Sequence, residues 1–298
     1  MINYSIIIPH KDIPSLLERC VLSIPQRDDV QIIIVDDNSD EYSVGKLQAL
    51  ERSCKQKSLS IIYLDDSQAK GAGHARNIGL SHAVGKWIVF ADADDTFEID
   101  SLNAAFDEYL ESDKDIVFFS INCLDAETLE KSNNANQAYL AHLFAKVDAE
   151  NRCRYKIKVP WGKFIKRKLI EYNAIRFEEV QVGNDAWFSL QIGYRAEKIA
   201  IDYTPVYNWM VRSGSITSNK GKEAVLTHLV LQSRLNSFKE SHKLSKYRSN
   251  IFVFIPMLLR AHVPMYKAVL LCAKNTSSRY ILNDIINVVK MLLLKCCC

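Results

Sequence analysis

Short apolar runs alternate with helix-like patterns over the first 120 residues of the chain. These runs have the length and composition of strands that are buried on both faces of a sheet. They cover residues 4–8, 31–35, 59–64, 87–91 and 115–120. A helix is predicted over 71–84, between the third and fourth runs. Strands separated by helices indicate βαβ units, so we predict an α/β fold with a mostly parallel sheet flanked by helices.

The rest of the chain carries a mainly helical pattern. We predict helices at 133–148 and 184–194, a turn followed by a basic helix over 160–172, and one or two strands at 199–211. From residue 222 the pattern is helical to the end, with prolines as breaks. The chain therefore changes from an α/β pattern to a helical extension.

Aspartates follow two of the predicted strands at the point where each strand ends. Asp36 and Asp37 follow the second strand, and Asp92, Asp94 and Asp95 follow the fourth. The carboxyl ends of parallel strands share one edge, and ligands bind beyond that edge. Carboxylates gathered there repel one another, which a cation and a polar ligand explain better than solvation alone. Mg²⁺ and Mn²⁺ prefer oxygen ligands and take one or two carboxylates together with substrate phosphates.

Both acidic runs also have a purely structural interpretation. Asp94 or Asp95 could cap the helix that begins near Glu98, and the run from Asp36 could form an Asx turn. A third feature, the start of the helix over 71–84, combines glycines and cations in a way that suits an anion. Arg76 lies in the first turn of that helix, where the dipole disfavours a cation. Either the aspartate cluster or a phosphate would resolve this conflict.

The ordered motifs of residues 3–220 resemble those of family-2-type inverting glycosyltransferases with the GT-A fold. They are VDDNS, G-x-x-x-ARN-x-G, DADD, PWGK, GND and RSGSIT. The resemblance implies transfer of a sugar from a nucleotide-diphosphate sugar, a UDP-sugar, to an acceptor hydroxyl in cell-surface polysaccharide or glycolipid synthesis. It implies a catalytic domain over 1–220, with a donor half over 1–120 and an acceptor half over 121–220. A helical C-terminal extension over 221–298 would follow.

The resemblance also assigns roles to individual residues. Asp185 would be the general base that takes the proton of the acceptor, unless it only caps the following helix. Asp94, with Asp92, would hold a divalent metal ion, Mn²⁺ or Mg²⁺. Donor binding would use Pro9, Asp36, Asp37, Arg76, Asp92, Asp94, Arg212 and Ser215, and the acceptor side would use Trp161, Lys163 and Asn184.

Two positions depart from the family pattern. Lys11 and Asp12 stand where the family usually has Tyr-Asn, which leaves open the residue that stacks on the base. Asn184 stands where Glu commonly precedes the catalytic Asp, although Asp185 itself is present.

Other classes of function can use parts of the same sequence. Asp92 to Thr96 also fits a haloacid-dehalogenase-like phosphatase, with Asp92 as nucleophile and Asp94 as acid/base. That motif normally opens its domain, whereas three strand units precede it here. A non-catalytic sugar-nucleotide binder is the second alternative, and it predicts losses at Asp94 or Asp185, which are both present.

The charge distribution and the cysteine content indicate where in the cell the protein would lie. The net charge is +3, but residues 239–298 hold ten Lys or Arg against two acidic residues. A basic, apolar segment predicts either docking on an anionic membrane or packing on the catalytic domain or a second subunit. It lacks the interleaved exposed aromatics of a nucleic-acid module, so no nucleic-acid partner is expected. Five of the eight cysteines are scattered without a C-x-x-C motif, and Cys296, Cys297 and Cys298 are consecutive. This usage and the lack of a membrane-length apolar run predict a cytoplasmic protein, peripheral on the inner face of the membrane if the tail docks.

Overall fold

The computed structural model describes the greater part of the chain. The described residues are 1–54, 58–132, 143–144, 147–180, 182–212, 221–250, 254–264, 266–267 and 270. The chain divides into two compact units, Met1–Ser213 and Gly214–Cys298. The assignment of catalytic and extension roles to these two parts stays a prediction.

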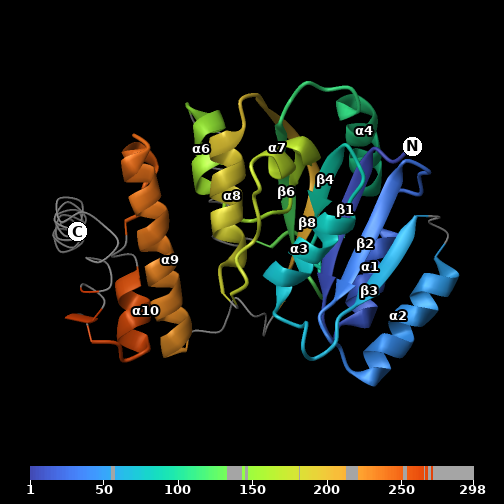
Figure 1. The fold of residues 1–298 in the computed structure, drawn as a ribbon, viewed down its shortest axis with the longest axis horizontal. Helices are drawn as coiled ribbons and strands as arrows, with labels where there is room; N and C mark the ends of the chain where they lie inside the picture. Colours follow the sequence, from blue (N-terminus) through green and yellow to red (C-terminus); the bar gives the residue numbers. More distant parts are fainter. Residues whose placement is uncertain are drawn as a thin grey trace. The chain divides into compact units, whose positions relative to one another are not determined.

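The first unit is built on one eight-stranded sheet with the order β3-β2-β1-β4-β7-β6-β8-β5. Its strands are β1 (Tyr4–His10), β2 (Val30–Asp36), β3 (Leu59–Tyr63), β4 (Trp87–Phe90), β5 (Thr96–Phe97), β6 (Ile116–Asp125), β7 (Lys163–Lys166) and β8 (Ile199–Val211). The four strands β3, β2, β1 and β4 run parallel, side by side (Figure 1). Strands β7 and β5 run antiparallel to their neighbours. The predicted α/β fold with a mostly parallel sheet is confirmed.

Helices cover both faces of this sheet. One apolar cluster joins the sheet to α1 (Pro14–Leu22), α2 (Glu41–Ser53) and α4 (Ile99–Tyr109). The other joins it to α3 (Ala72–His82), α6 (Ala149–Lys156), α7 (Arg167–Tyr172) and α8 (Asn184–Arg195).

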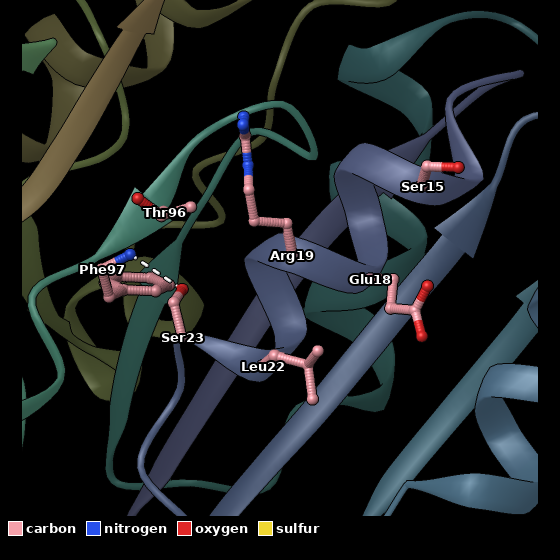
Figure 2. A pocket seen from close by; sticks show the side chains of 7 residues that line it. All are labelled: Ser15, Glu18, Arg19, Leu22, Ser23, Thr96 and Phe97. Carbon is pink, nitrogen blue, oxygen red and sulfur yellow. Dashed lines mark hydrogen bonds between the residues drawn. The ribbon is translucent and has the colours of Figure 1, made fainter. Parts of the chain in front are cut away.

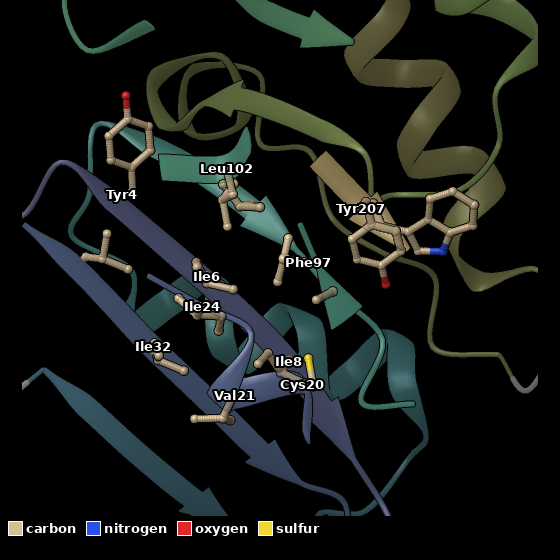
Figure 3. Close-up of a cluster of buried hydrophobic side chains, with 14 of the residues drawn as sticks. Tyr4, Ile6, Ile8, Cys20, Val21, Ile24, Ile32, Phe97, Leu102 and Tyr207 are labelled. Atoms are coloured by element: carbon tan, nitrogen blue, oxygen red, sulfur yellow. The ribbon is translucent and has the colours of Figure 1, made fainter. Parts of the chain in front are cut away.

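Successive residues of β1 alternate between the two clusters. Ile6 and Ile8 face α1, as Figure 3 shows, and Ile7 belongs to the other cluster. A strand covered on both faces must be apolar throughout, which explains the continuous apolar runs of the sequence.

One predicted element is wrong. The basic helix expected over 160–172 begins only at Arg167, because Lys163–Lys166 form β7 between β4 and β6. Phe164 packs in one apolar cluster and Ile165 in the other, the period of two that a strand requires. The lysines on either side of these two residues made a helical face plausible in so short a segment. The helix predicted over 133–148 lies largely outside the described residues.

The second unit contains α9 (Lys222–Ser241), the 3₁₀ turn η2 (Ser245–Tyr247) and α10 (Ile255–Arg260). Val225 and Leu229 of α9 pack with Leu258 and Val263 in a small apolar core. Residues 271–298, the last part of the predicted helical pattern, lie outside the described residues. Among the helices that are described, none has the length and apolarity needed to cross a bilayer.

Candidate functional site

The loop between β4 and β5 carries three carboxylates, and Asp95 fastens this loop to β8. Asp95 is buried and accepts hydrogen bonds from the Tyr207 hydroxyl at 2.7 Å and from the Met210 N–H at 2.8 Å. The Tyr207 hydroxyl in turn accepts the N–H of Asp92 at 3.0 Å. Helix α4 has Glu98 as its N-cap, without a side-chain cap. The interpretation of Asp94 or Asp95 as a helix cap is therefore wrong.

The other two carboxylates of the loop keep part of their surface exposed. The side chains of Asp92 and Asp94 are 33% and 25% exposed. Asp92 Oδ1 lies 2.6 Å from Arg76 Nη2, and Asp94 Oδ2 lies 2.9 Å from Arg212 Nη2. Burial and the charge of Asp92 raise the pKa of Asp94, and Arg212 offsets this only in part. Arg212 therefore does not fully compensate the buried charge of Asp94, a condition that favours a bound cation.

Arg76 joins this loop to the start of α8. Its guanidinium is buried, donates to Asp92, and also donates from Nη1 to Asn184 Oδ1 at 2.9 Å. The guanidinium carbon lies 5.4 Å from the centroid of the Phe177 ring. Arg76 is the fifth residue of α3, just beyond its first turn, and Asp92 is a negative group that stabilises this cation near the helix start. The aspartate cluster is one of the two partners that the sequence offered.

Asp185 lies in the first turn of α8, close to Arg76. The N-cap of this helix is Gly183, at φ 72°, with no side-chain cap. The interpretation of Asp185 as a helix cap is therefore wrong. Burial raises the pKa of Asp185, Asp92 adds to the increase, and Arg76 and Lys163 act against it.

Helix α3 reaches the start of α8 because residue 73 has no side chain. A Cβ on Gly73 would lie 2.2 Å from the carbonyl oxygen of Glu178 and 2.9 Å from the Cβ of Asn184. Two atoms cannot approach that closely, so any larger residue would push the two helices apart. The glycine-rich turn of the sequence thus brings Arg76 within reach of Asn184.

The carboxylates after β2 are occupied by internal partners. Asp36 is 1% exposed and lies 2.7 Å from His10 Nδ1, and it accepts the N–H of Ser39 at 3.0 Å. Burial raises the pKa of Asp36, but these hydrogen bonds outweigh burial and lower it. Asp37 accepts the N–H groups of Lys70 and Gly71, at 3.1 and 3.0 Å. The predicted contacts of both carboxylates with the donor nucleotide stay predictions.

Other predicted residues lie on β1, at the ends of β7 and β8, or outside the described part. Pro9 lies within β1, beside β2. Trp161 is buried and stacks on Tyr207, with ring centroids 5.2 Å apart. Lys163, the first residue of β7, is 2% exposed and donates from Nζ to the Val159 carbonyl. Ser215 lies outside the described residues.

A pocket of about 460 Å³ lies on the α1 side of the same loop (Figure 2). It is lined by Ser15, Glu18, Arg19, Leu22, Ser23, Thr96 and Phe97. Arg19 connects it with the aspartate loop, because its Nη2 donates to the carbonyl oxygen of Asp94 at 3.0 Å. The pocket therefore lies behind the loop, whereas the carboxylates of Asp92 and Asp94 meet Arg76 and Arg212.

The described residues contain no group of three or more His, Cys, Asp or Glu side chains placed to hold a metal ion. Asp92 and Asp94 still fit such an ion, because hard cations at phosphate sites take one or two protein carboxylates and complete their shell with phosphate oxygens and water. Both side chains keep part of their surface exposed at the end of β4, which leaves carboxylate oxygens for such an ion.

The sequence matches the family model "Glycosyl transferase family 2" over residues 5–174, more than half of the chain. The chain belongs to glycosyl transferase family 2. A curated relative, the cholesterol galactosyltransferase of Borreliella burgdorferi, is 28% identical over 233 residues. The match covers 73% of this family-2 chain and 63% of the relative, so the chain spans less than two thirds of that protein's length.

Solved structures show the same fold. Residues 1–349 of TarS from Staphylococcus aureus, in complex with UDP-GlcNAc, match with a TM-score of 0.62 and 18% identity, covering 85% of this chain and 73% of that one. The mannosyltransferase PcManGT from Pyrobaculum calidifontis, in complex with GDP-Man and Mn²⁺, matches with a TM-score of 0.57 and 17% identity. That match covers 98% of this chain and 80% of the other. At these identities the likeness shows the GT-A fold of this family-2 chain.

Proposed function

We propose that this chain is an inverting glycosyltransferase that moves a sugar from a UDP-sugar to a hydroxyl of a saccharide or lipid-linked saccharide. The observation that carries the proposal is the convergence of Asp92 and Asp185 on Arg76, with Asp94 beside Asp92. Family membership supports sugar transfer rather than the phosphatase alternative. The UDP-GlcNAc complex of TarS supports the donor class. Synthesis of cell-surface polysaccharide or glycolipid is the setting that the family resemblance implies.

Asp94, with Asp92, would hold Mn²⁺ or Mg²⁺ together with the diphosphate of the donor. Such an ion supplies Lewis-acid stabilisation of the charge that develops on the leaving diphosphate. The Mn²⁺ complex of PcManGT supports this part of the proposal. Arg212, which contacts Asp94, is placed to add a second positive charge at the same point.

Asp185 is the proposed general base. As the acceptor oxygen attacks the anomeric carbon, its proton passes to the Asp185 carboxylate, and the bond from that carbon to the diphosphate oxygen breaks. Attack from the face opposite the leaving group inverts the configuration. The first turn of α8 favours the ionised form of Asp185, while burial raises its pKa towards the range where a base works best at neutral pH.

Calorimetric titration of UDP with Mn²⁺ tests the donor site, and turnover of UDP-sugars tests the reaction. The Asp94→Asn variant should lose metal-dependent UDP binding. Asp185→Asn should keep that binding and lose turnover by about 10²- to 10⁴-fold, the usual contribution of a general base. Asp113→Asn, at an exposed carboxylate paired with Lys198, is the matched control and should behave as the wild type. Metal-dependent UDP binding without transfer to any acceptor would favour the non-catalytic binder.

The proposed membrane partner concerns the basic tail, residues 239–298. Leu259, Arg260, Tyr266 and Lys267 of this segment are exposed, a mixture of apolar and cationic side chains that suits an anionic lipid surface. Flotation with anionic vesicles should recover the full chain and leave a 1–238 truncation behind. Equal flotation of both would contradict docking by the tail and leave the protein-packing alternative.

A further inference from the structure

We infer that Lys163 is a positioning residue, a buried cation beneath α8 that keeps the carboxylate of Asp185 ionised for proton transfer. The inference deepens the proposed function and rests on the assignment of Asp185 as the base. The sequence resemblance placed Lys163 at the acceptor. Because its side chain is 2% exposed, we assign it a contact with the protein interior instead.

The geometry starts at the carbonyl oxygen of Val159. Lys163 Nζ donates to this oxygen from β7, and Ser189 Oγ donates to the same oxygen at 3.2 Å from α8. Ser189 follows Asp185 by four residues, one helical turn, so both lie on the same face of α8. The ammonium of Lys163 is therefore held against the face of α8 that carries Asp185.

The surroundings of Lys163 make its charge costly without a carboxylate nearby. The hydrogen-bond acceptor that the described residues supply is one neutral carbonyl, and the ring centroid of Phe118 lies 5.5 Å from Nζ. A buried ammonium needs an opposite charge to offset its lost hydration. Asp185 is the acidic residue that stabilises this ammonium, ahead of the Cys153 thiol.

Lys163 and Asp185 each favour the charged form of the other. Burial lowers the pKa of Lys163 to about 7, and Asp185 acts against that decrease. Lys163 in turn acts against the rise that burial causes in the pKa of Asp185. Below about pH 7 Lys163 is charged and supports the carboxylate, and above that pH it loses its charge and its support. The charged or titratable groups that face the pair are Arg76, Asp92, Lys158 and Cys153.

Lys166 offers a matched control on the same strand. Its Nζ also donates to a backbone carbonyl, that of Ser112 at 2.7 Å, and lies over an aromatic ring, 3.9 Å from the centroid of Trp87. Burial again lowers the pKa of this lysine, to about 8, but the charged groups around it are Lys86, Glu111, Asp113 and Asp115. Lys166 therefore shares with Lys163 the strand, a backbone acceptor and an aromatic neighbour, but it is only half-buried and its charged neighbours do not include Asp185.

The test is the pH profile of kcat/KM for Lys163→Gln, which keeps a donor for Val159 but removes the charge. We expect the acid limb to move to higher pH, with about a tenfold loss at pH 6 and convergence on the wild type above about pH 8. Lys166→Gln should keep the wild-type profile. A loss of equal size at every pH would indicate packing alone and overturn the inference, as would an unchanged profile.

A measurement without turnover separates this inference from the proposed function. In ¹³C NMR of carboxyl-labelled protein, with the Asp185 resonance identified by Asp185→Asn, this carboxyl should titrate at higher pH in Lys163→Gln than in the wild type. Lys163→Met provides a second charge-free side chain if the Gln variant does not fold. Identical titrations would overturn the role of Lys163, whereas absence of wild-type sugar transfer would overturn only the function of Asp185.

Discussion

Two groups of carboxylates share one edge of the sheet and differ in what holds them. Asp36 and Asp37, after β2, receive hydrogen bonds from buried side chains and backbone amides. Asp92 and Asp94, after β4, keep exposed surface and face arginines that offset only part of their charge. Asp36 and Asp37 therefore stabilise the loops at this edge, whereas Asp92 and Asp94 have carboxylate oxygens left for a ligand. Shared position at a ligand-binding edge is therefore not enough to give carboxylates the same role.

Asp95 shows that neighbours in the chain can belong to different groups. It directly follows Asp94, yet its two oxygens are filled by Tyr207 and Met210 of β8. Burial and the charges of Asp92 and Asp94 raise the pKa of Asp95 well above its usual value. Contacts, rather than place in the acidic run, decide which carboxylates hold the loop and which face outward.

The largest effect in this comparison is expected for Asp36→Ala. The change leaves the buried His10 and the Ser39 amide without their acceptor, so the free energy of unfolding should fall by about 3 kcal/mol at pH 7. Because the pKa of Asp36 is lowered on folding, its contribution is present above the ordinary value of 3.8 and is lost as the pH falls through the folded value. Urea unfolding at neutral and acidic pH measures both. A cost below about 1 kcal/mol would place Asp36 with the ligand-binding group.

A smaller effect of opposite sign is expected for Asp94→Asn. The pKa of Asp94 is raised on folding, so any stability it contributes is present below 3.8 and is lost as the pH rises through the folded value. At pH 7 the neutral amide should therefore match or exceed the wild type in stability, by less than about 1 kcal/mol because the lost Arg212 pair is partly exposed. The difference should vanish below pH 3.8. If urea unfolding showed that Asp94→Asn is clearly destabilised at pH 7, the distinction between Asp36 and Asp37 on one side and Asp92 and Asp94 on the other would be wrong.

The sequence predicted those parts of the molecule that depend on local pattern. The buried strands β1, β2 and β4 are continuous apolar runs, and the sheet brings the acidic runs after β2 and β4 to one edge, as βαβ units require. The dipole conflict at Arg76 correctly indicated a nearby negative group, which is Asp92. In each case the feature depends on residues that are near one another in the sequence, or on the parallel order of the strands.

The sequence could not show features that depend on distant contacts. Strand β7 is four residues long and owes its conformation to pairing with β4 and β6. Burial of Lys163 depends on the same packing, and lysine is rarely buried. Tyr207 carries no local signal, because its role is a hydrogen bond to a residue 112 positions earlier. His10, one of the internal partners of Asp36, likewise comes from a distant element, the end of β1.

The hydrogen bond from Tyr207 to Asp95 sets the order in which the aspartate loop can be completed during synthesis. Strands β1 to β4 can pair with one another before β8 is synthesised, since all four lie within the first 90 residues. The aspartate loop must wait for Tyr207 and Met210, more than 110 residues later. Closing so large a loop is entropically slow. A nascent chain stalled before β8 would thus have a paired sheet whose aspartate loop is not yet fixed.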